Sequence, residues 1–175
     1  FDGVDDGVTG PNLALPSAFT LMAWVFNPSN SSYETLVTVG SSRDVYLASG
    51  AIRFWDGSAE HTFGSALSTN TWHHVALVSD GSTVRAYLNG APQGSTAPSL
   101  LAPITGTLGV GAVSDAGDTW DFFAGRIDDV RVYTRAFTQS EIQTTMDTPV
   151  SAPQSDTTPP GLGSASPTGT LPAGT

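Results

Sequence analysis

Residues 123–142 read FAGRIDDVRVYTRAFTQSEI, and this stretch decides the fold. Apolar and polar residues alternate through its first half, as they do in a half-buried strand. Ile127, Val130 and Val132 supply the branched side chains that strands favour. The pattern predicts a final strand over residues 122–133.

A turn and a short helix are expected after this strand. Thr138 and Glu141 stand at the spacing of a capping box, in which each residue satisfies a free backbone amide of the other. Ile142 and Met146 are four residues apart and share one helical face. The sequence therefore predicts one short C-terminal helix over about residues 140–146.

The rest of the chain is divided by Asp-Gly and Asn-Gly pairs, which favour turns. Between them lie short runs rich in β-branched and aromatic residues. The predicted strands cover residues 19–26, 33–39, 45–48, 52–55, 72–78, 84–88 and 107–113. Strands this short and this closely spaced predict an all-β fold, an antiparallel two-sheet β-sandwich or jelly roll.

The composition suits an extracellular all-β domain. Only 13% of the 175 residues are charged, so Ser, Thr, Gly and Asn provide much of the solvation. Six Arg, with no Lys, face 16 acidic residues, and the formal net charge is −10. Nucleic acids and anionic lipids need cationic side chains to meet their phosphates, so both are unfavourable partners.

The cysteine content, the hydropathy and the composition of the C-terminal residues indicate the setting of the domain. The chain has no Cys, and no apolar run approaches the roughly 18 residues of a membrane helix, so we expect no disulfide and no membrane insertion. Residues 148–175 are rich in Pro, Gly, Ser and Thr, which predicts a linker to a following module. We expect a monomeric domain over residues 1–147, covalently linked to neighbouring domains of a longer secreted or cell-surface bacterial protein.

Five segments together resemble a known family, the laminin-G-like, concanavalin A-like jelly-roll domains. The segments that carry the resemblance are FDGVDDGV (1–8), FTLMAWV (19–25), TWHHVAL (71–77), DGSTVRAYLNG (80–90) and residues 123–142. The resemblance covers residues 1–147 and implies a binding module rather than a catalyst. It also implies that Trp24 and Trp72 are packing residues of the core.

The resemblance further implies that the first and last strands pair, with residues 1–8 beside residues 122–133. Many domains of this family hold a structural calcium near these termini. Adjacent carboxylates repel one another unless a cation lies between them, and Ca²⁺ takes six to eight oxygen ligands. The predicted calcium ligands are Asp6 and Asp128, assisted by Asp2 and Asp129, whereas Asp5 occupies a variable position of the motif.

Salt bridges are the alternative for these carboxylates. In that case the aspartates near the N-terminus stabilise a turn and the two on the last strand pair with arginines. The candidate ion pairs join Asp128 or Asp129 to Arg126 or Arg131.

Several aromatic residues lie in polar, turn-rich surroundings, where sugar-binding proteins often place rings that stack on pyranoses. Neighbouring polar side chains would then contact the hydroxyl groups. The candidate ligand-binding residues are Trp120, Trp55, Tyr33, Tyr46, Arg43 and Asp118. Packing within loops is the alternative for each of these aromatics.

Catalysis finds little support in the sequence. The E-x-D-x-E strand of glucanases that share this fold is absent, as are a G-x-S-x-G elbow and a zinc-binding histidine motif. The favoured hypothesis is a non-catalytic carbohydrate-binding, lectin-like module with a structural calcium, on a secreted bacterial protein. The alternatives are a structural or adhesive spacer and a glycan-degrading hydrolase or lyase.

Overall fold

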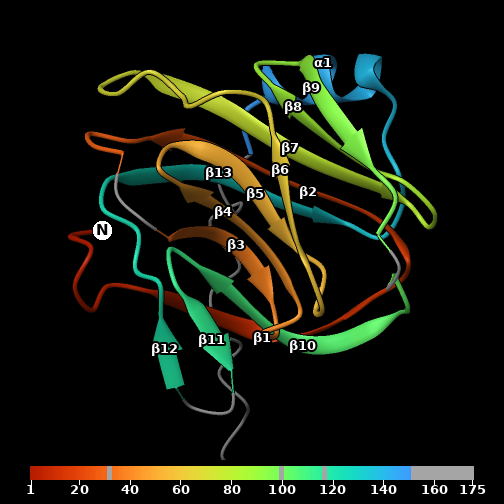
Figure 1. Cartoon of the computed structure of the whole chain (residues 1–175), viewed down its shortest axis with the longest axis horizontal. Coiled ribbons are helices and arrows are strands. Elements are labelled where there is room, and N and C mark those ends of the chain that lie inside the picture. The colour runs from red at the N-terminus through yellow and green to blue at the C-terminus, as the bar shows by residue number, and fades with distance from the viewer. Residues whose placement is uncertain (31–32, 99–100, 116–117, 151–175) are drawn as a thin grey trace, which may run out of the picture.

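The computed structural model describes residues 1–30, 33–98, 101–115 and 118–150. Its strands form two antiparallel sheets that pack face to face, with one short helix, as the sequence predicts (Figure 1). The predicted linker, apart from its first residues, lies outside the described residues.

The first sheet has six strands in the order β1-β10-β3-β4-β5-β6, and every neighbouring pair is antiparallel. The strand bounds are Val8–Leu15 (β1), Ile104–Val110 (β10), Glu34–Val39 (β3), Arg43–Ala48 (β4), Ala51–Trp55 (β5) and Glu60–Phe63 (β6).

The second sheet has five strands in the order β13-β2-β7-β8-β9, again antiparallel throughout. Its strand bounds are Arg126–Tyr133 (β13), Ala18–Phe26 (β2), Trp72–Asp80 (β7), Val84–Leu88 (β8) and Ala91–Thr96 (β9). A separate two-stranded hairpin is made of Val113–Asp115 (β11) and Asp118–Trp120 (β12).

The core lies between the two sheets, and β2 shows how alternation builds it. Phe19, Leu21, Ala23 and Val25 are almost fully buried in the inter-sheet core. Burial of each large apolar side chain of this kind stabilises a fold by about 1.5–3 kcal/mol. The residues between them point to the opposite face, as the two-residue period of a strand requires.

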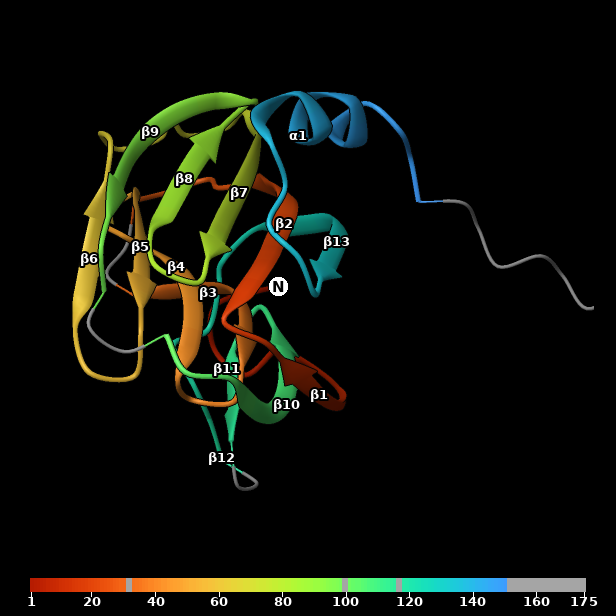
Figure 2. The same cartoon turned by 90° about the vertical axis from the view of Figure 1, so that its right-hand side faces the viewer.

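The helix α1, Gln139–Met146, packs on the outer face of the five-stranded sheet (Figure 2). The predicted capping box is present: Thr138 accepts a hydrogen bond from the backbone of Glu141, and the Glu141 side chain accepts from the cap backbone. Ile142 is fully buried in a second apolar cluster that includes Met22 of β2. The helix is therefore the predicted one, and it starts one residue earlier.

The predicted pairing of the first and last strands is limited to one bridge. Phe1 exchanges two backbone hydrogen bonds of 3.0 Å with Gly125, and Asp2 forms an antiparallel bridge with Ala124. Gly3 then adopts a left-handed φ of +81° against Ala124, and the chain turns away. The strand that follows, β1, pairs with β10 in the other sheet, while β13 pairs with β2.

The two predicted core tryptophans lie outside the inter-sheet core. Trp24 packs under the helix, where its Nε1 donates to the carbonyl of Met146 at 3.1 Å. Trp72 is 39% exposed beside Phe26, so the prediction of a core residue was wrong there. The register explains this: Trp72 pairs with Phe26, which shares the outer face of β2 with Trp24.

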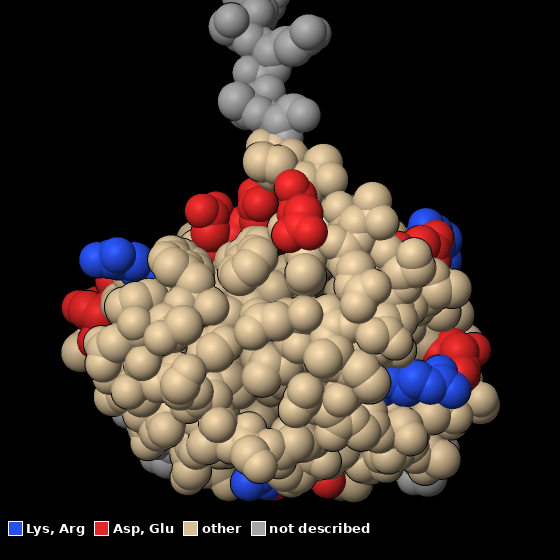
Figure 3. Space-filling view, turned by 90° about the horizontal axis from the view of Figure 1, so that it is seen from above, with Lys and Arg blue, Asp and Glu red and all other residues tan. Residues whose placement is uncertain are grey.

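The surface seen from above carries few charged side chains, in keeping with the low charged content of the chain (Figure 3). Within the described residues, the helix is too short and too polar to cross a membrane.

Candidate ligand-binding site

A cavity of about 470 Å³ lies on the outer face of the six-stranded sheet. Its lining residues are Tyr33, Ser41, Asp44, Tyr46, Trp55, Glu60, Val113, Trp120 and Asp121. All four aromatic residues predicted to bind a ligand therefore meet in one place. The volume falls within the range of ordinary small-molecule sites.

The alternation of β4 decides which side chains face this cavity. Val45 and Leu47 point into the core, so Asp44 and Tyr46 point outward. Across the sheet, Asp44 pairs with Trp55, and Trp55 pairs in turn with Glu60. Three neighbouring strands thus place an acid, an aromatic ring and a second acid in one row.

Two further segments supply the walls. Trp120, in the β11–β12 hairpin, pairs with Val113, and Asp121 follows it directly. The Asp121 carbonyl accepts a 2.9 Å hydrogen bond from the amide of Thr35 on β3, which fixes the end of the hairpin to the sheet. The ring of Tyr33 stacks on that of Tyr46, with centroids 5.9 Å apart and planes inclined by 27°.

The backbone is strained at two lining residues. Tyr33 has φ +46° and Asp121 has φ +56°, both in the left-handed region that non-glycine residues rarely enter. Such conformations cost about 1–3 kcal/mol each and concentrate at functional sites. Asp tolerates the region better than Tyr does.

Asp44 forms part of the cavity floor and is only 6% exposed. Its Oδ2 accepts a 3.1 Å hydrogen bond from Thr35, but its Oδ1 is buried and has no partner among the described residues. Burial raises the pKa of this carboxyl to about 8; the hydrogen bond from Thr35 opposes the shift and the charge of Asp121 adds to it. Burial also raises the pKa of Asp121.

Tyr46, Glu60 and Arg53 form a chain of polar contacts at the other side of the cavity. The Tyr46 hydroxyl donates to Glu60 Oε2, and Arg53 forms an ion pair with Glu60 Oε1. Burial and the neighbouring Glu60 raise the pKa of Tyr46, so its hydroxyl stays a donor. Glu60 is thereby held by two donors.

The two polar residues predicted to bind a ligand, Arg43 and Asp118, are not among the described residues that line the cavity. Arg43 is buried, and its guanidinium donates to the carbonyls of Ser42, Asp56 and, at 2.9 Å, Ala102. It immediately precedes Asp44 on the strand, so it faces the opposite side of the sheet. The backbone of Asp118 pairs within the β11–β12 hairpin, and its side chain lies outside the described part of the chain.

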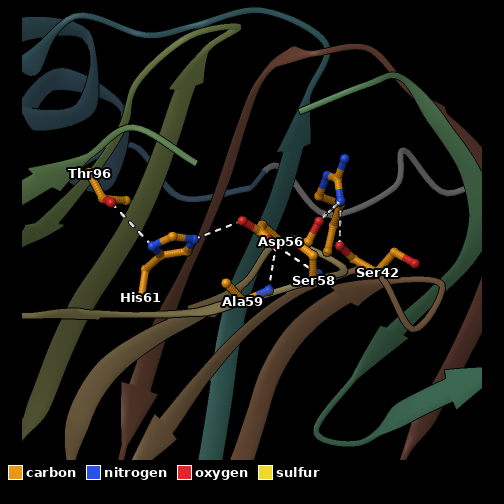
Figure 4. A network of polar contacts seen from close by, with 7 residues as sticks. Ser42, Asp56, Ser58, Ala59, His61 and Thr96 are labelled. Atoms are coloured by element: carbon orange, nitrogen blue, oxygen red, sulfur yellow. Dashed lines mark hydrogen bonds and ion pairs between the residues drawn. The ribbon is translucent and has the colours of Figure 1, made fainter. Parts of the chain in front are cut away.

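A separate polar network begins at Asp56, just after β5. Its Oδ1 accepts 2.7 Å hydrogen bonds from the amides of Ser58 and Ala59, which closes the turn to β6. Its Oδ2 lies 2.8 Å from Nε2 of His61, whose Nδ1 lies 3.1 Å from Oγ1 of Thr96 on β9 (Figure 4). The network therefore links an edge strand of one sheet to an edge strand of the other.

An acid, an imidazole and a hydroxyl in series occur in hydrolase triads, but a structural role fits this network better. Thr96 does not line the aromatic cavity described above. Burial of Asp56 would by itself raise its pKa, yet the hydrogen bonds from His61, Ser58 and Ala59 together outweigh that effect and lower the pKa to about 2. A carboxylate so fully occupied stabilises the turn.

The candidate metal ligands fall into two groups. In the described part of the chain, one set of three carboxylates has ligand atoms within 4.8 Å of one another: Asp2, Asp5 and Asp6. Asp128 instead accepts a 2.8 Å hydrogen bond from the amide of Asp129. Asp129 forms a 3.5 Å ion pair with Arg131, which is one of the salt bridges expected as the alternative.

Comparisons with other proteins agree with the fold. A family model described as "Concanavalin A-like lectin/glucanases superfamily" matches residues 2–143. No curated protein sequence matches the chain significantly.

Similar solved structures share the fold at low sequence identity. Domain 4 of AbnA, a GH43 extracellular arabinanase from Geobacillus stearothermophilus in complex with arabinotriose, is 22% identical with a TM-score of 0.67, over 83% of this chain and 74% of that chain. The CBM40 of the Ruminococcus gnavus IT-sialidase bound to α2,3-sialyllactose is 15% identical with a TM-score of 0.64, over 81% of this chain and 96% of that chain. A SAP-like pentraxin from Limulus polyphemus is 19% identical with a TM-score of 0.64, over 82% of this chain and 78% of that chain.

Proposed function

The chain belongs to the concanavalin A-like lectin/glucanase superfamily, and on that premise we propose that it is a non-catalytic carbohydrate-binding domain of a secreted, multidomain bacterial protein. One observation carries the proposal: Tyr33, Tyr46, Trp55 and Trp120 come from separate segments and line one cavity with polar groups. The sugar-bound neighbours with the same fold support this reading.

The arrangement suits a sugar ring. Trp120 and Tyr33, 38% and 53% exposed, offer apolar faces at the rim on which the ring can stack. Asp121, Glu60 and Ser41 offer polar atoms to the hydroxyl groups at the ring edge. Few, fixed polar contacts within an aromatic surface are what small-ligand sites use for orientation and specificity.

Binding to an immobilised glycan panel tests the proposal, with Trp120→Ala as the site variant and Trp72→Ala as its matched control. The two tryptophans are almost equally exposed, at 38% and 39%, but only Trp120 lines the cavity. We expect Trp120→Ala to weaken binding of the recognised glycan by about tenfold or more, the effect of losing an aromatic stacking contact. Trp72→Ala should bind as the unmodified domain does. Equal losses in both variants, or no binding across the panel, would contradict the proposal.

A glycan hydrolase is the second candidate, because Asp44, Glu60 and Asp121 line the same cavity and glycosidases act through paired carboxyl groups. The contacts favour binding instead. Glu60 is held by Tyr46 and Arg53, and the free oxygen of Asp44 is buried away from solvent. We expect no release of reducing ends from any glycan that binds; release that Asp121→Asn abolishes would establish catalysis.

We further propose a structural calcium at the N-terminal turn. Asp2, Asp5 and Asp6 fit Ca²⁺ by donor type, since hard oxygen ligands close together are what the ion prefers. The turn also has its own support without metal: the Asp2 carboxylate accepts from the amide of Val4 at 2.8 Å, and the Asp6 carboxylate from the amide of Asp2 at 3.0 Å. Calcium would add to this turn by offsetting repulsion among three carboxylates.

A further inference from the structure

The cavity is acidic as well as aromatic. Asp44, Glu60 and Asp121 line it, and its described lining includes no basic residue. Arg53 forms an ion pair with Glu60, so that carboxylate already has a counter-charge. Asp44 and Asp121 have no ion-pair partner within the described residues.

Asp44 shows most clearly that the acids of this cavity lack a partner. The side chain is more than nine-tenths buried, and its Oδ1 has no hydrogen-bond partner among the residues described. A buried polar atom without a partner is costly, and a buried charge without one more so. The raised pKa values of Asp44 and Asp121 have the same origin: burial, with no cation to offset it.

The walls of the cavity also suit a cation. Tyr33 stacks on Tyr46 beside Asp44, and Trp55 and Trp120 complete the aromatic surface. Aromatic faces attract ammonium groups through their quadrupole, most strongly for Trp and when the group is desolvated. A metal ion fits less well, because it needs several converging oxygen ligands, and the described carboxylates that converge in this way are Asp2, Asp5 and Asp6.

Building on the carbohydrate-binding function proposed above, we propose that the recognised glycan carries protonated amino groups, as unacetylated hexosamine units do. The sugar ring stacks on the rim tryptophan, and its ammonium lies among the tyrosine and tryptophan faces against Asp121. The buried carboxyl of Asp44 lies beneath the cavity and attracts the ammonium through space. A neutral or N-acetylated sugar leaves Asp121 without a counter-charge and Asp44 protonated, whereas a nearby ammonium favours the ionised form of both carboxyls. A uronic or sialic acid adds a further negative charge and is repelled.

Isothermal titration with three β-1,4-linked oligosaccharides of equal length tests this, built from glucosamine, N-acetylglucosamine and glucose. The experiment is done below neutral pH, where the amine is protonated, and at physiological ionic strength, which screens charges more than a Debye length apart. We expect the glucosamine oligomer to bind at least about tenfold tighter than the other two, the gain of one ammonium among aromatic and acidic groups.

Three variants separate the cavity from the overall charge of the protein. Asp121→Asn and Asp44→Asn each remove one carboxyl from the cavity at nearly constant shape, and each should bring the preference for the amino oligomer toward unity. Asp147→Asn removes an exposed carboxyl at the end of α1 and should keep the preference. An equal loss of preference in all three variants would mean that the net charge of −10, and not the cavity, attracts the amino oligomer. That result would overturn the inference.

The outcomes for the two proposals differ. Equal affinity for the three oligosaccharides, or tighter binding of the acetylated or neutral one, would overturn the amino-glycan inference and leave the carbohydrate-binding function in place. Binding of other glycans on the panel but none of these three would do the same. Absence of binding to every glycan would overturn the function itself.

Discussion

Asp44 has the least favourable surroundings of the site residues, because one oxygen is hydrogen-bonded and the other is buried without a partner. A buried carboxyl oxygen without a partner lowers the stability of the fold, and a role in ligand binding would explain why it is kept. The strained backbone of Tyr33 and Asp121 belongs to the same cavity. On the proposed function, stability and binding compete at these individual residues.

The first prediction concerns Asp44→Asn. The folded pKa of about 8 lies above the unfolded value near 3.8, so the folded state holds its proton more tightly. The stability of the protonated form is complete below about pH 4 and is lost as the pH rises toward 8. The asparagine variant cannot ionise and keeps its bond to Thr35. Its stability relative to the unmodified domain should rise by a few kcal/mol between pH 5 and pH 8.

Urea unfolding at several pH values measures this difference. Asp147→Asn, at an exposed position, serves as the control for loss of one negative charge. A constant difference between Asp44→Asn and the unmodified domain across the pH range would show that Asp44 does not titrate in this interval.

At the residue scale, the sequence identifies the aromatic residues of the candidate cavity better than its polar ones. The four aromatics stand out because large rings in polar surroundings are unusual, and the cavity unites them. Asp44 was missed in favour of Arg43, its neighbour, because a one-residue error in a strand selects the opposite face. Glu60 and Asp121 gain their role only through strands that meet across the sheet, which no local pattern reveals.

At the scale of elements, α1 shows how a short helix is held by its ends and one face. Its first turn is satisfied by the capping box, Ile142 fills the cluster beneath it, and the carbonyl of Met146 accepts from Trp24. Eight residues are too few to be helical alone in water, so these contacts maintain it.

The second prediction is that Thr138→Ala lowers the free energy of unfolding by about 1 kcal/mol, the usual effect of removing an N-cap. The Thr138 side chain accepts from the Glu141 amide at 3.3 Å, and alanine leaves that amide unsatisfied. Thr144→Ala, in the same helix and exposed, is the control; it should be neutral or slightly stabilising because alanine favours helix. Chemical unfolding followed by tryptophan fluorescence compares them. Equal effects of the two changes would mean that the cap contributes little.

Strands with apolar alternation were predictable, whereas strands without it were not. β2, β5 and β8 match their predictions closely because branched and aromatic residues dominate them. β9, with the sequence APQGST, and the short β6 and β12 carry no such signal and form because neighbouring strands offer them hydrogen bonds. The first strand was placed at residues 1–8 rather than 8–15, where a glycine, a proline and an asparagine interrupt the pattern.

At the scale of the whole molecule, acidic residues far outnumber basic ones, 16 to six. A net charge of −10 on 175 residues favours solubility and opposes compactness through self-repulsion. Any cation that binds the folded form alone stabilises it by mass action. The turn at Asp2, Asp5 and Asp6 concentrates three of these charges near the point where the chain crosses from one sheet to the other.

The third prediction is therefore a calcium-dependent melting temperature. Calcium at a hundred times its dissociation constant stabilises a folded protein by about 2.7 kcal/mol, or roughly 5–10 °C for a domain of this size. Asp5→Asn should abolish the response, and Asp128→Asn should retain it, because Asp128 lies outside the carboxylate cluster. Thermal unfolding with calcium or with chelator measures both. Loss of the response in Asp128→Asn but not in Asp5→Asn would favour the ligands expected from the sequence, Asp6 and Asp128. No response to calcium in the unmodified domain would exclude a stabilising calcium.

The link between His61 and Thr96 has a consequence for self-association. β6 and β9 are edge strands of different sheets, and an unpaired edge is where a second chain can add by hydrogen bonding. Here the two edges lie against each other through the imidazole, with Gly64 packed against Gln93 just beyond it. Addition of a second chain at β6 or β9 would have to open this seam first. Amide hydrogens of β6 and β9 should accordingly exchange more slowly with deuterated solvent than their position at the sheet edges suggests, and His61→Ala should both speed that exchange and shorten the lag before aggregation.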